Sequence, residues 1–362
     1  MRLLFRHTNQ GSTAVSRETI LEPDLPIIDP HHHVWERFLP PLPPGAPVHP
    51  FIEIFARRPK YLFHEYLADL KSGHNVRATV FVECGAFYKA DGPVHLRSVG
   101  ETEFVNGVAA MSASGMYGNI GVCAGIVGNA DCTLGDGIKE VLEAHLAAGG
   151  GRFRGIRNVA SYDADDNVLG PHPRPPINDL YMSDAFRAGY RHLADYDLSF
   201  DAWLLEPQLP ELIDLVRQFP EIPVILDHIG TPLGLASYQG RREERFPIWL
   251  ANIKELAKSP NVSVKLGGLA NAICNFPSFH FDPPASSTQL AADWAPYLEA
   301  CIEAFGPQRC MFESNFPVDI VGCDYDVLWN AFKVFAKGYS ADEKTALFSG
   351  TAAKFYRLAL PA

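Results

Sequence analysis

The sequence lacks several features that mark whole classes of protein. No apolar segment is long enough to span a membrane, so we do not expect a membrane protein. No long basic run occurs and the formal net charge is -11 at pH 7, so nucleic acid is a poor partner. No G-x-G-x-x-G motif follows the first predicted strand, which argues against a dinucleotide cofactor.

Cysteines are few and show no pairing pattern. The 7 cysteines are odd in number, scattered, and include no C-x-x-C pair. A disulfide framework or a structural zinc site needs clustered cysteines, so we expect reduced thiols and a cytoplasmic protein. Residues 1–22 lack the apolar core of a signal peptide. We therefore interpret residues 1–23 as an N-terminal extension and residues 24–362 as one domain.

Short apolar segments alternate with helical patterns along most of the chain. With 47% hydrophobic residues, the chain can cover strands on both faces, as a parallel sheet requires. The predicted strands are 26–35, 76–84, 120–127, 153–159, 198–205, 222–228, 262–266 and 309–315. Helical spacing is found at 61–70, 134–147, 209–219, 248–256 and 290–304. This alternation predicts the α/β class and a distorted (β/α)8 TIM barrel.

The first predicted strand carries an aspartate and two histidines. Asp29 is followed by His31 and His33, and alternate side chains of a strand share a face. His31 and His33 therefore point to one side and His32 to the other. Two imidazoles side by side are half of a site for a zinc-like ion. A histidine-rich turn is the alternative, but a position inside an apolar strand does not favour it.

Charged and polar residues recur at the ends of the other predicted strands. TIM-barrel active sites lie at the C-terminal ends of the strands, so these side chains would surround one pocket. A single one is more often half of a structural ion pair, but burying a whole ring of them without a shared purpose is costly. They are Glu83, Arg157, Glu206, His228, Lys265, Glu313 and Asn315.

Two long segments follow strands and would lie over the same face. Residues 36–60 are rich in proline, and residues 271–288 carry Phe276, Phe279 and Phe281. Lids over a barrel mouth are built from such loops. Tyr88 and the lid aromatics could cover a flat substrate ring, but core packing is the favoured interpretation for each aromatic taken singly. For the two segments, a cap on the barrel mouth or a subunit contact in a homo-oligomer stays an open alternative to a lid.

Four motifs follow one another in a specific order. They are Asp29-Pro30-His31-His32-His33, Glu206-Pro207-Gln208-Leu209-Pro210, Asp227-His228-Ile229-Gly230 and Ser314-Asn315-Phe316-Pro317. From about residue 24 to residue 358 the chain resembles the amidohydrolase superfamily. More narrowly, it resembles the amidohydrolase-related branch with pyrone-dicarboxylate lactonase and sugar-acid lactonases. The resemblance implies a barrel hydrolase in which water attacks the carbonyl of a lactone, ester or cyclic amide.

Two positions depart from the pattern of that family. Glu206 stands where the family usually has a histidine, and Asn315 stands where it usually has a metal-binding aspartate that accepts a proton. An amide cannot accept a proton at neutral pH. We favour His31, His33 and Glu206 as ligands of a divalent ion, zinc or manganese, with Glu313 as a further ligand. Such an ion would lower the pKa of bound water to about 7.

The remaining roles follow from this hypothesis. Asn315 and His228 would orient or polarise the substrate carbonyl. Arg157, Glu83, Lys265 and Tyr88 would bind a small carboxylated substrate, with Arg154 as a weaker candidate.

Several alternatives stay open at this point. The site would work without metal if Glu206 or Glu313 were the general base. A non-oxidative decarboxylase of an aromatic or unsaturated acid would need no water-activating aspartate, and carbon dioxide release would reveal it. An inactive barrel that only binds a ligand is the third alternative, although its retained buried charges argue against it.

Overall fold

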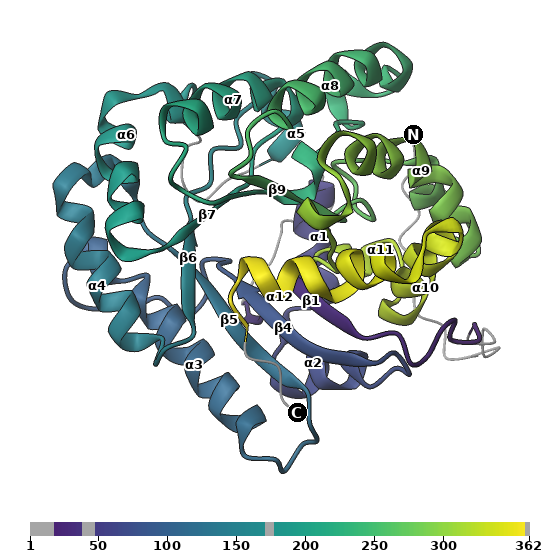
Figure 1. The fold of residues 1–362 in the computed structure, drawn as a ribbon, viewed down its shortest axis with the longest axis horizontal. Helices are drawn as coiled ribbons and strands as arrows, with labels where there is room; N and C mark the ends of the chain where they lie inside the picture. The colour runs from purple at the N-terminus through teal and green to yellow at the C-terminus, as the bar shows by residue number, and fades with distance from the viewer. Residues whose placement is uncertain (1–17, 38–47, 171–176, 359–362) are drawn as a thin grey trace.

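The computed structural model of the protein describes residues 18–37, 48–170 and 177–358. Eight parallel strands form one sheet in the order β1-β4-β5-β6-β7-β8-β9-β10, and the sheet curls into a nearly closed barrel (Figure 1). Helices surround the barrel and connect successive strands. The predicted (β/α)8 fold is confirmed.

The strands are mostly shorter than the apolar segments that predicted them. They are β1 (Ile27–His32), β4 (Val76–Val82), β5 (Gly121–Asn129), β6 (Phe153–Arg157), β7 (Ser199–Ala202), β8 (Val224–Leu226), β9 (Val262–Leu266) and β10 (Cys310–Phe312). A separate antiparallel pair joins β2 (Trp35–Glu36) to β3 (Lys60–Tyr61). Because the strands end early, several predicted site residues lie in the turns just beyond them.

The five predicted helical patterns correspond to observed helices. These are α2 (Phe63–Leu70), α4 (Ile138–Ala148), α7 (Leu209–Gln218), α8 (Arg242–Leu256) and α9 (Ser287–Phe305). Further helices are α1 (Pro50–Arg57), α3 (Val99–Ala113), α5 (Asp166–Leu169), α6 (Asp184–Tyr190), α10 (Tyr325–Phe335), α11 (Ala341–Thr345) and α12 (Thr351–Phe355). In the three described ranges, no helix combines the length and the apolar character that a membrane span requires.

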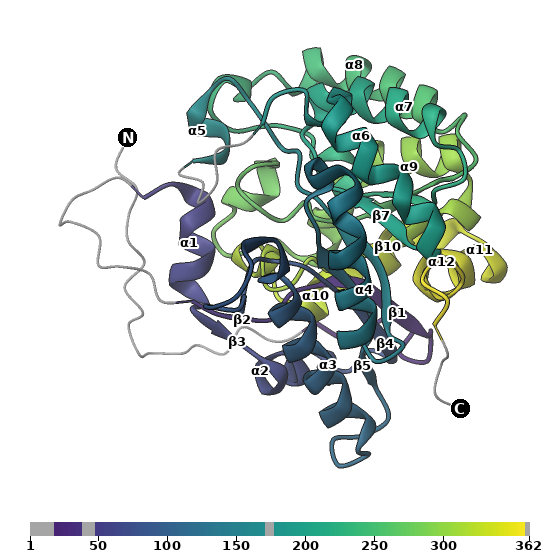
Figure 2. The ribbon, with the colours of Figure 1, turned by 90° about the vertical axis from the view of Figure 1, so that its left-hand side faces the viewer.

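A small apolar core lies inside the barrel. It contains Ile28, Ala78, Val80, Val82, Val127, Ile225 and Met311 from the strands, with Ala352 and Tyr356 at the C-terminal end of the chain. The helix α12 therefore closes the barrel at the N-terminal ends of the strands. Figure 2 shows α1 and α12 on opposite sides of the barrel. The polar side chains of the interior lie above this core, toward the C-terminal ends of the strands.

Backbone hydrogen bonds close the seam between the first and last strands. The Asn315 N–H donates to the His31 carbonyl at 2.9 Å, and the His33 N–H donates to the Phe316 carbonyl at 2.8 Å. Both bonds lie beyond the end of β10. The histidine pair and the turn after β10 are thereby held together directly.

The Asp29 carboxylate supports the same seam from the outside of the barrel. It accepts hydrogen bonds from the hydroxyls of Ser314 at 2.6 Å, Tyr66 at 2.9 Å and Tyr325 at 3.1 Å. The Ser314 N–H adds a fourth bond at 3.0 Å. Burial nevertheless raises the pKa of Asp29. Asp29 thus ties β1 to the turn after β10, α2 and α10.

Both predicted lid segments contain regular structure. Residues 36–60 include α1 and β3, and residues 38–47, with most of the prolines, lie outside the described residues. Residues 271–288 contain a short 3₁₀ turn, and α9 begins at Ser287. Movement of either segment as a lid stays a prediction.

The last residues of the predicted extension pack onto α10. The Leu21 N–H donates to Asn330 Oδ1 at 2.9 Å, and Lys333 Nζ donates to the carbonyls of Leu21 at 2.7 Å and Glu22 at 3.0 Å. The described part of the extension is therefore continuous with the barrel. Residues 1–17 of the extension lie outside the described residues.

Candidate active site

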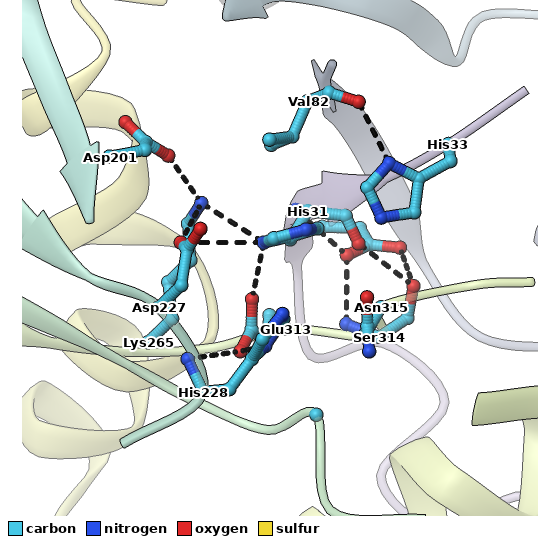
Figure 3. A network of polar contacts seen from close by, with 12 residues as sticks. His31, His33, Val82, Asp201, Asp227, His228, Lys265, Glu313, Ser314 and Asn315 are labelled. Atoms are coloured by element: carbon cyan, nitrogen blue, oxygen red, sulfur yellow. Dashed lines mark hydrogen bonds and ion pairs between the residues drawn. The ribbon is translucent and has the colours of Figure 1, made fainter. Parts of the chain in front are cut away.

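Three histidines meet at the C-terminal end of the barrel (Figure 3). The centroid of the His31 ring lies 4.9 Å from that of His33 and 4.6 Å from that of His228. His32 points the other way and stacks on Tyr66 with a centroid distance of 4.2 Å. Strand alternation therefore predicted correctly which histidines share the interior.

Hydrogen bonding determines which nitrogen of His33 carries the proton. His33 Nδ1 lies 2.8 Å from the Val82 carbonyl oxygen, which can only accept a hydrogen bond. Nδ1 is therefore protonated and Nε2 keeps a lone pair. Burial, reinforced by the neighbouring His31 and Arg157, lowers the pKa of His33 well below 6.5. His33 is a neutral imidazole with a free basic nitrogen.

Glu313 joins the other two histidines. Its Oε1 accepts from His228 Nδ1 at 2.7 Å and from the His228 N–H at 3.2 Å, and its Oε2 lies 2.8 Å from His31 Nδ1. Burial alone would raise the pKa of Glu313, but the two imidazoles lower it to about 2. Burial alone would lower the pKa of His228, but Glu313 raises it above 6.5. The pKa values of His228 and His33 are thus shifted in opposite directions.

His31 has a charged neighbour at each ring nitrogen. Its Nδ1 lies 2.8 Å from Glu313 Oε2 and 3.2 Å from Lys265 Nζ, and its Nε2 lies 3.5 Å from Arg157 Nη1. Lys265 and Arg157 can only donate, so a lone pair on either nitrogen of His31 has a donor beside it. These contacts hold the ring between the carboxylate and the two cations.

Two buried cations lie beside His31, and an aspartate binds both. Lys265 Nζ donates to Asp201 Oδ2 at 2.6 Å and to Asp227 Oδ1 at 2.9 Å. Arg157 donates to Glu83 Oε1 through Nε at 2.8 Å and to Asp227 Oδ2 through Nη1 at 3.3 Å. Burial would raise the pKa of Asp227, but Lys265, His31 and Arg157 hold it well below 3.8. These contacts position both cations rigidly.

The charges of this cluster do not balance without a further positive group. The two cations, Lys265 and Arg157, lie among four carboxylates, so the cluster has a formal excess of two negative charges. The carboxylates are those of Glu83, Asp201, Asp227 and Glu313. Protonated histidines or a divalent ion would compensate for it. His31, Asp227 and His228 each offer a ligand atom, and these atoms lie within 4.8 Å of one another. This mixed imidazole and carboxylate set fits zinc or manganese.

The His228 turn has an unusual backbone. His228, Ile229 and Thr231 have φ of 55°, 51° and 48°, a left-handed conformation that costs about 1–3 kcal/mol for each non-glycine residue. Trp249 Nε1 supports the turn by donating to the Ile229 carbonyl at 2.8 Å. A Cβ on Gly268 would lie 2.2 Å from His228 Nδ1, so a glycine after β9 is required to seat the ring.

Asn315 is oriented by a buried carboxylate. Its Nδ2 donates to Asp319 Oδ1 at 3.0 Å, and Asp319 also accepts from Asn271 Nδ2 at 3.0 Å and the Ala270 N–H at 2.9 Å. Burial raises the pKa of Asp319 to about 6. Asn315 Oδ1 is buried and has no hydrogen-bond partner within the described residues. The amide oxygen can therefore accept a further hydrogen bond.

Three residues predicted from the sequence lie apart from the histidines. Glu206 is buried in a 3₁₀ turn after β7 and accepts from Arg245 Nε at 2.8 Å, so its role as a metal ligand stays a prediction. Tyr88 is half-buried in the loop after β4. Arg154 was a wrong candidate for substrate binding, because its Nε donates to the Tyr356 carbonyl at 2.6 Å, at the closed end of the barrel.

Sequence reasoning missed the two interior aspartates and an aromatic neighbour. Asp201 lies in β7 and Asp227 directly after β8, and both are fully buried. An acid inside an apolar strand is a signal in itself, because a buried carboxylate requires a partner. Trp203, just after β7, has its ring centroid 5.4 Å from the Arg157 guanidinium carbon. No sequence pattern marks that contact.

A model of the amidohydrolase family matches residues 28–358. The chain belongs to the amidohydrolase family. This amidohydrolase is 33% identical over 341 residues to an uncharacterised protein of Sinorhizobium fredii, covering 92% of this chain and 99% of that one. It is 31% identical over 215 residues to the L-fucono-1,5-lactonase of Burkholderia multivorans, covering 59% of this chain and 66% of that enzyme. The predicted family is confirmed, and a hydrolase is supported.

Solved structures of other proteins share the architecture of this amidohydrolase. An amidohydrolase of Burkholderia multivorans with bound zinc has a TM-score of 0.66 and 26% identity, covering 92% of this chain and 99% of that chain. A 5-carboxyvanillate decarboxylase of Novosphingobium aromaticivorans with bound manganese has a TM-score of 0.57 and 14% identity, covering 93% and 98%. The second likeness concerns the fold alone.

Proposed function

We propose that this amidohydrolase opens a small lactone by attack of water at the carbonyl. The observation that carries the proposal is that the surroundings of His33 and His228, which both lie beside His31, drive their pKa values in opposite directions. His33 is neutral with a free Nε2, whereas Glu313 favours the protonated form of His228. Two titratable groups whose pKa values are driven apart supply a general base and a general acid. The similarity to L-fucono-1,5-lactonases supports a lactone as the substrate.

The proposed reaction needs no group beyond the histidines, water and the substrate. The water oxygen forms a bond to the carbonyl carbon, and His33 Nε2 takes the proton that water loses. The ring C–O bond breaks, and the leaving alkoxide takes a proton from His228 Nε2. The product is an open hydroxy acid. Asn315 Oδ1, which lacks a partner among the described residues, would accept a hydrogen bond from a substrate hydroxyl.

Arg157 and Lys265, the two cations predicted to bind a carboxylated substrate, both have carboxylate partners inside the protein. Arg157 is engaged by Glu83 and Asp227, and Lys265 is fully buried between Asp201 and Asp227. Both cations are already matched, so we propose that a neutral lactone binds better than a carboxylated one. In this proposal Lys265 positions His31 and makes no contact with the substrate.

A panel of lactones tests the function directly. We expect acid release from neutral sugar lactones, including L-fucono-1,5-lactone, and slower release from a pyrone dicarboxylate. His33→Gln is expected to lower kcat/KM by about 10²–10⁴-fold, the usual effect of losing a general base. His95→Gln changes a surface histidine paired with Glu140 and serves as the control. Carbon dioxide release from aromatic acids would identify a decarboxylase, and no turnover of any kind would favour an inactive barrel.

We further propose that zinc or manganese binds in exchange for the proton on His228. His31, Asp227 and His228 would hold the ion, in accord with their mutual spacing. An ion there would polarise the carbonyl and lower the pKa of bound water to about 7. His33 Nε2 would accept the proton of water in either state. With the ion bound, His228 would carry no proton to donate, so His33 would return the proton that it took from water to the leaving alkoxide.

Elemental analysis of untagged protein tests the metal and its ligands. We expect close to one zinc or manganese per chain, and a loss of that metal in His228→Gln. Glu206→Ala is expected to keep the metal, because Glu206 is bound to Arg245. Loss in Glu206→Ala with retention in His228→Gln would instead support His31, His33 and Glu206 as ligands. Metal-free protein that hydrolyses lactones would leave the histidine pair as the whole catalytic apparatus.

A further inference from the structure

Polar side chains link the histidine cluster to the closed end of the barrel. The hydroxyl of Tyr356, directly after α12, donates to Asp201 Oδ2 at 2.7 Å. Lys265 Nζ donates to the same oxygen at 2.6 Å and reaches Asp227 Oδ1 at 2.9 Å and His31 Nδ1 at 3.2 Å. All five side chains belong to residues that are 0% exposed. The chain of contacts therefore runs entirely inside the barrel.

Asp201 depends on Tyr356 for its position. Its Oδ2 bonds to Tyr356 and Lys265, and its Oδ1 has no hydrogen-bond partner among the described residues. Without the hydroxyl, Lys265 would be the remaining partner, and the pair would be free to move together. Lys265 would then no longer hold the same distance to His31. Tyr356 is held in place by two contacts. Arg154 Nε donates to its carbonyl, and its ring packs in the apolar core inside the barrel.

We infer that Tyr356 is a positioning residue for His31, acting through Asp201 and Lys265. The C-terminal segment of the chain, on the side of the barrel away from the substrate, would thereby set the geometry of the reaction. The inference on structure does not depend on the substrate, whereas its effect on turnover rests on the proposed lactone hydrolysis.

Tyr356→Phe removes one oxygen atom and tests the inference. We expect the ring nitrogen resonances of His31 to move in ¹H–¹⁵N spectra of the histidine side chains, with His31→Gln providing the assignment. Lactone hydrolysis is expected to lose about tenfold in kcat with KM within about twofold, because a positioned group is displaced without loss of binding. Tyr61→Phe is the matched control, since it removes a buried hydroxyl that donates to Asp69 at 2.6 Å.

Asp201→Asn keeps the side-chain shape and removes the charge, and it should move the same resonances. This variant replaces Tyr356→Phe as the test where the latter does not fold. Unchanged His31 resonances would overturn the inference, as would equal changes in Tyr61→Phe. Moved resonances in a protein without lactonase activity would support the positioning role and refute the proposed function.

Discussion

Glu313→Gln is expected to lower kcat/KM for lactone hydrolysis by about 10²–10⁴-fold while leaving the barrel folded. The carboxylate contacts His228 Nδ1 at 2.7 Å and His31 Nδ1 at 2.8 Å, so one substitution disturbs two histidines. A neutral amide no longer favours protonated His228, and its NH₂ group faces a ring N–H. Steady-state kinetics on the best lactone of the panel would measure the loss.

Glu313→Gln is also expected to change how lactone hydrolysis depends on pH. In the metal-free enzyme, activity falls as pH rises through the pKa of His228, which Glu313 raises above 6.5 despite burial. Glu313→Gln lowers that pKa, so the alkaline fall is expected to begin at lower pH. Glu103→Gln, at an exposed glutamate paired with Lys89, should leave rate and profile unchanged. Wild-type kinetics in Glu313→Gln would remove His228 as the proton donor.

Asp227→Asn is expected to destabilise the protein by about 3–5 kcal/mol, the usual cost of breaking a buried ion pair. Asp227 accepts from Lys265 at 2.9 Å and Arg157 at 3.3 Å, and all three residues are buried. In the variant, Lys265 and Arg157 each lose a negatively charged partner, and the protein interior solvates their charges poorly. Equilibrium unfolding in urea at pH 7 would measure the change in free energy.

The effect of Asp227→Asn should shrink in acid. The folded-state pKa of Asp227 lies well below 3.8, so its contribution is complete above pH of about 4 and is lost as pH falls toward the folded value. Asp214→Asn, which changes a half-exposed aspartate paired with Arg187, is expected to cost less than about 1 kcal/mol. A similar cost for both variants would show that the interior network contributes little to stability.

The fold could be predicted from the sequence because strands and helices leave patterns in short stretches of the chain. Parallel strands buried on both faces need apolar runs, and 262–266 was predicted with the bounds that β9 has. The shared face of His31 and His33 follows from the same alternation. Strands β7, β8 and β10 end earlier than predicted, because their pairing with neighbouring strands stops at Ala202, Leu226 and Phe312. α3 was missed because it is buried on several sides and shows little one-sided periodicity.

By itself the sequence determined the barrel, its family and the strand ends that carry the site. Only the tertiary structure decided what each side chain does there. Glu206 was expected beside the histidines, yet Arg245 of α8 binds it at 2.8 Å. Glu313 was expected to be a further metal ligand or a general base, and the structure shows that its carboxylate joins two imidazoles. Asp201 and Tyr356 are 155 residues apart and meet inside the barrel. A buried charge takes the partner that lies nearest in space, and the spacing of residues along the chain does not specify that partner.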